Sequence, residues 1–137
     1  MKNDSPACIH RLHDGKIHEY AFTEVSRRAL DEMFAIIEEI VSEAARNNRP
    51  EDQYNPTLLD SSIGIQPLNH AFQKMQPLVS QYPAIRQARI AIIVPPSPLV
   101  GTISKILRTV TPMRFYKPGE RNQALAWLRE VHATRQG

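Results

Sequence analysis

Apolar and polar positions follow two different periods along the chain, and the period predicts which segments are helices. Between residues 26 and 46, apolar residues recur at steps of three and four, which is the period of one helix face. This stripe consists of Leu30, Met33, Phe34, Ile37, Ile40, Val41 and Ala44. Ser26 stands before the stripe as an N-cap, and the polar residues 47–50 end the helix. We therefore expect a long helix with one buried face.

The same helical period recurs three more times. After Pro67, which suits the first helical position, the stripe is Leu68, Ala71, Phe72, Met75 and Val79. Pro77 lies inside this segment and should break or kink the helix. A third helix follows Ser97 and Pro98, with a stripe expected to be buried: Leu99, Val100, Ile103, Ile106, Leu107 and Val110. The last helix carries Ala124, Leu125, Trp127, Leu128 and Val131.

Short apolar runs between these helices predict strands. Asp14-Gly15 joins the runs 8–13 and 16–22, and this dipeptide favours a hairpin with a two-residue type I′ turn. Such a turn would pair Leu12 with Ile17 and His10 with Glu19. Residues 90–94 form an unbroken apolar run of mostly β-branched residues, which is typical of a strand covered on both faces. Residues 57–59 and 113–116 predict two more short strands.

The order of these elements predicts an α/β fold. Strands and helices alternate as ββαβαβαβα, which indicates a single-domain mixed, mostly parallel sheet of about five strands with four helices. A chain of 137 residues suits one hydrophobic core. We expect one domain over residues 7–132, with terminal tails at 1–6 and 133–137.

Composition and charge exclude some classes of function but do not identify the function. The net charge is +3, but the arginines are scattered rather than gathered into a stripe, so we expect no nucleic-acid binding. No apolar run approaches the roughly 20 residues of a membrane span, and the first residues lack the apolar core of a signal peptide. Cys8 is the only cysteine, which suits a reducing compartment. We expect a cytoplasmic protein.

Polar residues follow two neighbouring strands at the points where the strands end. Asp60, Ser61 and Ser62 come after one strand, and Ser97 comes after the next. Because parallel strands end at the same edge of a sheet, both loops should meet there, each leading into a helix N-terminus suited to anions. These serines could therefore hold a phosphate. Alternatively, Ser97 only caps its helix and residues 60–62 form an ordinary turn, which Asp and Ser favour.

Other chemistry finds little support in the sequence. His10, His13 and His18 lie near Glu19 in the hairpin, but a zinc site needs three or four converging ligands, so we expect a solvated hairpin face. No nucleophile elbow, P-loop or dinucleotide motif is present. We therefore expect no catalytic residues, metal or cofactor, and an enzyme with a dispersed site is the weaker alternative.

Three stretches resemble a known family. They are "TLLDSS", "ARIAIIVPPSPLVGTISKIL" and "MRFYKPGERNQALAWLRE", and the similarity extends over about residues 8–130. The chain resembles the STAS domain of anti-sigma-factor antagonists and, more closely, the SpoIIAA-like group, which is related to the CRAL-TRIO lipid-carrier fold. The resemblance implies that Ser61, which follows Asp60, is phosphorylated by a partner kinase. This chain departs from the family pattern in placing Ile63 between Ser62 and Gly64.

The resemblance leads to two functional expectations. The first is a bacterial, non-enzymatic, cytoplasmic module that binds a protein partner, such as a kinase or regulatory protein, under the control of phosphorylation near Ser61. A homodimer formed through an edge of the sheet is compatible with it. The alternative, implied by the lipid-carrier relatives of the fold, is a carrier or sensor of a small apolar ligand or lipid, held where the helices part.

Overall fold

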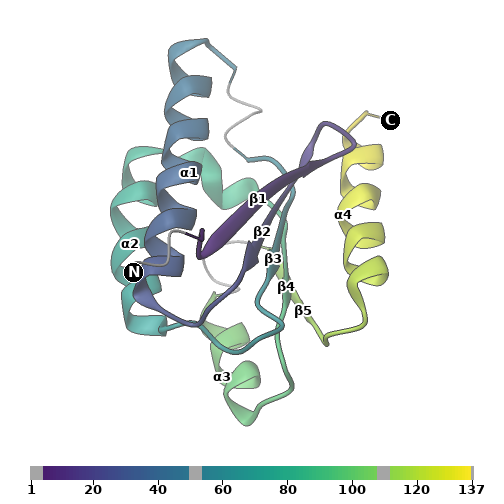
Figure 1. The fold of residues 1–137 in the computed structure, drawn as a ribbon. Helices are drawn as coiled ribbons and strands as arrows, with labels where there is room; N and C mark the ends of the chain where they lie inside the picture. The colour runs from purple at the N-terminus through teal and green to yellow at the C-terminus, as the bar shows by residue number, and fades with distance from the viewer. Residues whose placement is uncertain (1–4, 50–53, 108–111, 137) are drawn as a thin grey trace.

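A mixed five-stranded sheet forms the centre of the protein (Figure 1). The computed structural model describes residues 5–49, 54–107 and 112–136. The strands lie in the order β1-β2-β3-β4-β5, where β1 and β2 are antiparallel and the other neighbours are parallel. Their bounds are β1 Cys8–His13, β2 Ile17–Phe22, β3 Thr57–Asp60, β4 Ile90–Ile93 and β5 Met113–Tyr116. The predicted α/β class and element order are confirmed.

Helices cover the two faces of the sheet unequally. They are α1 Arg27–Arg46, α2 Leu68–Gln81, α3 Pro98–Leu107 and α4 Arg121–Gln136, with a short 3-10 helix η2 at Pro83–Gln87. Strands β2 to β5 are added in one direction, so right-handed crossovers place α1, α2 and α3 on the same face. Only α4 lies on the other face (Figure 1). It extends to Gln136, past the domain boundary expected at 132, whereas residues 1–4 and 137 of the expected tails lie outside the described residues.

The hairpin register differs from the prediction by one residue. Asp14 and Gly15 have the positive φ angles of the predicted turn, 56° and 70°, and the Lys16 N–H donates to the carbonyl of His13. However, His13 pairs with Ile17, which leaves Lys16 as an additional loop residue. The predicted pairing of His10 with Glu19 was therefore wrong. With this one-residue shift, residues of β1 and β2 that were predicted to share a face of the sheet lie on opposite faces.

The long first helix begins as predicted. Ser26 is the N-cap of α1, and its hydroxyl accepts a hydrogen bond from the N–H of Ala29 at 3.1 Å. In contrast, α2 continues through Pro77, so the predicted break was wrong. In a regular helix the N–H of residue 77 would donate to the carbonyl of Gln73, and proline has no N–H. Both residues lie on the exposed side of α2. The lost hydrogen bond is therefore on the side of the helix that faces water.

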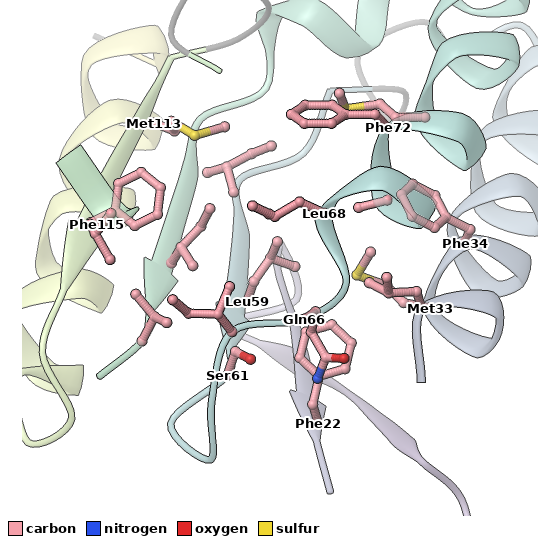
Figure 2. Close-up of a pocket in the computed structure, with 18 residues that line it drawn as sticks. Phe22, Met33, Phe34, Leu59, Ser61, Gln66, Leu68, Phe72, Met113 and Phe115 are labelled. Atoms are coloured by element: carbon pink, nitrogen blue, oxygen red, sulfur yellow. The ribbon is translucent and has the colours of Figure 1, made fainter. Parts of the chain in front are cut away.

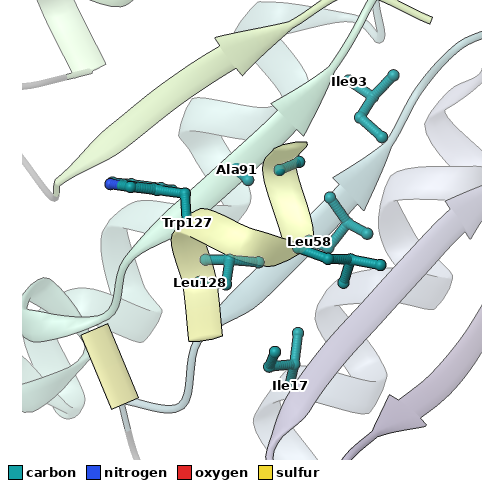
Figure 3. Packing of buried hydrophobic residues seen from close by; sticks show 8 residues of the cluster. Ile17, Leu58, Ala91, Ile93, Trp127 and Leu128 are labelled. Atoms are coloured by element: carbon teal, nitrogen blue, oxygen red, sulfur yellow. The ribbon is translucent and has the colours of Figure 1, made fainter. Parts of the chain in front are cut away.

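Each face of the sheet has its own core. Beneath α4 the buried residues are Ile17, Leu58, Ala91, Ile93, Ala124, Leu125, Trp127 and Leu128 (Figure 3). Beneath α1 they are Ala7, Cys8, Tyr20, Phe22, Ala29, Leu30 and Met33. The Trp127 ring also lies 4.9 Å from the guanidinium carbons of Arg89 and Arg114, which covers the indole with charged side chains.

The start of α3 is more exposed than its stripe predicted. Leu99 is 56% exposed, so its assignment to the buried stripe was wrong. It stands in the first turn of α3, directly after the loop that leaves β4. Val100, the next residue, is half-buried, and Val110 lies outside the described residues.

Candidate functional site

Asp60 ends β3 and faces α4 rather than α2. Its Oδ2 atom lies 3.3 Å from Nη1 of Arg121, the first residue of α4. Its Oδ1 atom accepts hydrogen bonds from the backbone N–H and the hydroxyl of Ser62, at 3.1 and 2.5 Å. Asp60 therefore closes a local turn and also anchors the beginning of α4.

Ser61 turns to the opposite face and is only 4% exposed. Its hydroxyl donates to the carbonyl of Gly64, and the Gly64 N–H donates back to the carbonyl of Ser61 at 3.0 Å. Its own N–H donates to the carbonyl of Ile93 at 2.8 Å, which extends the pairing of β3 with β4. Ser61 is thus built into a closed turn, whereas Ser62 is exposed.

Ser97 caps its helix. Its hydroxyl accepts from the N–H of Leu99 at 3.2 Å, and its carbonyl accepts from Val100 at 3.0 Å. The loops after β3 and β4 do leave the same edge of the sheet, because these strands are parallel. Within the described residues, however, no hydrogen bond joins Ser97 to the 60–62 turn. The structure thus brings the two loops to one edge without assembling their hydroxyls around a common point.

A cavity of about 150 Å³ lies between the sheet and the α1, α2 and α3 layer (Figure 2). In Figure 2, Met33 and Phe34 of α1 lie on one side of it and Met113 and Phe115 of β5 on the other. Its lining is Phe22, Leu30, Met33, Phe34, Leu59, Ser61, Ile65, Gln66, Leu68, Ala71, Phe72, Met75, Ile90, Ile92, Val94, Val100, Met113 and Phe115. The sequence pattern identified most of these residues as buried faces but did not predict a space between them.

The two polar residues of the lining have their hydrogen bonds satisfied within the protein. Ser61 donates to Gly64, as described above. The side-chain oxygen of Gln66 accepts from the N–H of Ser26 at 3.0 Å, and its amide nitrogen donates to the carbonyl of Glu24 at 2.8 Å. Neither residue directs a free polar group into the cavity, so the cavity suits an apolar occupant.

On the α4 face, a charged cluster surrounds Glu19. The Glu19 side chain is 0% exposed, and its carboxylate lies 2.6 Å from Nε2 of His13, 2.5 Å from Nη1 of Arg121 and 3.8 Å from Nη1 of Arg11. Burial by itself would raise the pKa of Glu19, but the hydrogen bonds from Arg121 and His13 outweigh it and lower that pKa below its usual 4.5. The expected solvated hairpin face was therefore wrong for Glu19. Its main partner, Arg121, is 102 residues away in sequence.

The histidines of the hairpin do not assemble a metal centre. His10 and His18 share a hydrogen bond of 2.9 Å on the α1 face, where His10 also stacks on Tyr20. His13 lies on the other face with Glu19. Among the described residues, no group of three or more histidine, cysteine, aspartate or glutamate side chains is arranged to hold a metal ion.

Three large apolar side chains are exposed at the edge where the parallel strands end. Val25, Ile63 and Leu99 are 47, 52 and 56% exposed and follow β2, β3 and β4 in turn. Val25 lies against the 61–64 turn, because a side chain on Gly64 would meet its Cγ2 atom at 3.0 Å. Two of the segments that form this apolar edge (Val25, Ile63 and Leu99), which are the turn after β3 and the first turn of α3, also supply Ser61 and Val100 to the cavity.

The fold and cavity define an α/β protein with a mixed five-stranded sheet and an apolar space on one face. Comparisons with family models, with curated proteins and with solved structures found no match to this chain. Among the helices of the described residues, none combines the length and apolar character needed to cross a membrane.

Proposed function

We propose that this protein binds a small apolar molecule, or the apolar part of a larger one, and acts as its carrier or sensor. The observation that carries the proposal is the cavity of about 150 Å³ whose lining is apolar except for Ser61 and Gln66. A cavity of about 150 Å³ lined by leucine, isoleucine and phenylalanine is large enough to bind benzene or xenon. Burial of such a ligand would be driven by removal of its apolar surface from water.

The role is proposed to be non-enzymatic. Burial, assisted by the negative charge of Glu32, raises the pKa of the Cys8 thiol to about 12, so this thiol is protonated and unreactive at neutral pH. The Ser61 hydroxyl donates to Gly64 rather than to a base. Neither group has the activation that a nucleophile requires.

Filling the cavity tests this proposal. Ala71→Leu adds volume at a lining position on α2, and we expect the affinity for a small fluorescent apolar probe such as naphthalene to fall at least tenfold. The thermal stability of the unliganded protein should stay equal or rise, because the added carbons enter empty space and are worth up to about 0.8 kcal/mol each. Fluorescence titration and thermal unfolding measure the two effects.

The matched control is Ala126→Leu, which makes the same change at an exposed position of α4 on the opposite face. It should leave probe binding unchanged. If Ala71→Leu instead destabilised the protein by the 1–3 kcal/mol typical of an overpacked core, the space would already be filled and the proposal would be wrong. Native mass spectrometry of protein purified without denaturant gives an independent test, in which a ligand-sized additional mass supports the proposal.

A second candidate, the cytoplasmic protein-binding module, is favoured by the apolar edge. Exposed apolar groups in adjacent loops are a feature of surfaces that bind other proteins. A phosphate in the 60–62 turn would add about −1.5 to −2 charges beside Asp60 and compete for Arg121, which links the turn to α4. Ser62 is the hydroxyl of this turn that solvent reaches.

Phosphorylation of this turn is tested by incubating the protein with ATP and extract of its own cells. We expect one added phosphate in the intact mass, which Ser62→Ala abolishes. Ser61→Ala should retain it, because the buried Ser61 hydroxyl is bonded to Gly64. Unmodified wild-type protein after complete incubation would count against regulation by phosphorylation.

A further inference from the structure

A second, largely apolar cavity lies beside the first. It measures about 130 Å³ and lies under α1 and η2 at the beginnings of the strands. Thr57 and Ile90, the first residues of β3 and β4, line it. Ser61 and Val94, which directly follow the ends of the same strands, line the first cavity. Ile90 lines the first cavity as well, and so does Met113 at the beginning of β5, so the two spaces lie next to one another on the same face of the sheet.

Side chains rather than backbone separate the two cavities. Both are lined by the same five residues, which are Met33, Phe34, Leu59, Met75 and Ile90. Met33 comes from α1 and Met75 from α2, so the partition includes one methionine from each helix. Methionine is unbranched and has three rotatable bonds, so it changes rotamer and fills irregular space more readily than other apolar residues. Rotation of these two side chains would join the cavities.

The size of the cavities selects the shape of the ligand. Each is smaller than the roughly 300–1,000 Å³ of pockets that hold compact, drug-sized molecules. A compact ring system large enough to use both volumes would have to displace the partition. An unbranched hydrocarbon chain is narrow and flexible, so it would occupy both spaces once the side chains of Met33 and Met75 have rotated aside.

We propose that the two cavities form a single channel for an unbranched aliphatic chain, with Met33 and Met75 as its movable partition. This inference rests on the proposed function and adds to it the class of ligand. The polar groups of Ser61 and Gln66 are already bonded within the protein, so the first cavity offers no polar partner to the head group of the ligand. The second cavity is also lined by the polar residues His18, Tyr20, Asn55 and Thr57.

The test is the dependence of affinity on chain length, measured by isothermal titration of the whole protein with octanoate and dodecanoate. Dodecanoate should bind about 200-fold more tightly, because each of its four additional buried methylenes contributes about 0.8 kcal/mol. Met75→Trp should block the channel, so that dodecanoate binds no better than octanoate. Gln76→Trp, on the exposed side of α2, should retain the wild-type preference for dodecanoate.

A second blocking variant keeps the test valid if Met75→Trp fails to fold. Ile40→Trp adds volume to the second cavity from α1, and Ile40 is not among the residues that line the first. It should also abolish the preference for dodecanoate. If octanoate and dodecanoate bind the wild type equally, or if the preference survives both blocking variants, the channel is overturned but the single-cavity function stands. If neither chain nor the fluorescent probe binds the wild type, the proposed function fails as well.

Discussion

Replacing Arg121 with methionine is expected to destabilise the protein by roughly 3 kcal/mol at neutral pH, the low end of the penalty for breaking a buried ion pair. The reason is that Glu19 has no exposed surface, and Arg121 donates to both of its carboxylate oxygens. Methionine keeps the length of the side chain but leaves the carboxylate with His13 and the more distant Arg11. Urea unfolding monitored by circular dichroism measures the loss.

The effect should depend on pH in a defined direction. The pKa of Glu19 is lowered in the folded protein, so its pairing stabilises the fold above the unfolded pKa of about 4.5, and this contribution is lost as pH falls through the folded pKa. Protonated Glu19 needs no positive partner. The difference in unfolding free energy between wild type and Arg121→Met should therefore shrink as the pH is lowered below about 4.5.

Two further variants test whether Arg121 stabilises the protein by its charge. Arg129→Met removes an exposed ion pair of the same helix, in which Nε of Arg129 lies 2.7 Å from Asp14, and it should change stability far less than Arg121→Met does, because water and salt screen an exposed pair. The double variant Glu19→Gln, Arg121→Met should be more stable than Arg121→Met alone, because a neutral amide requires no compensating charge. A double variant no more stable than the single one would show that Arg121 acts by packing rather than by charge.

The fold could be predicted because its signals are local. The stripe of α1, the β-branched run of β4 and the Ser26 and Ser97 caps each depend on residues within a few positions of one another. The same holds for the Asp60 turn, where the carboxylate bonds Ser62 two residues away. These local preferences agree with one another, and the predicted order of elements follows from them.

The register of the hairpin and the cavity depend on contacts that are distant in sequence. Glu19 lies on the face of β2 that α4 covers, where it accepts hydrogen bonds from Arg121. The pattern of residues within the hairpin does not predict this contact. The cavity depends on how closely side chains from separate elements approach, for example Leu68 of α2 and Phe115 of β5. Periodicity indicates that such residues turn inward, but it does not give the volume left between them.

The two faces of the sheet should respond differently to the same truncation. Leu128→Ala, on the α4 face, is expected to destabilise the protein by about 3–4 kcal/mol, because Leu128 has no exposed surface and packs among Leu58, Ala91 and Ile93 (Figure 3). Leu68→Ala, on the cavity face, should lower stability by only about 1 kcal/mol. Leu68 is half-buried and already borders empty space, so it makes fewer contacts to lose.

The expected difference between Leu128→Ala and Leu68→Ala assigns separate roles to the helices on the two faces of the sheet. A tightly packed α4 face, together with the Glu19 and Arg121 pair, would supply most of the stability and so permit the α1, α2 and α3 face to remain incompletely filled. Binding of a chain to that face should then stabilise the wild type in proportion to ligand concentration. The Leu128→Ala variant, though less stable, should keep wild-type affinity for dodecanoate, measured below its unfolding temperature. Equal destabilisation by Leu68→Ala and Leu128→Ala would show that the cavity face is as tightly packed as the α4 face, and the division of roles would not hold.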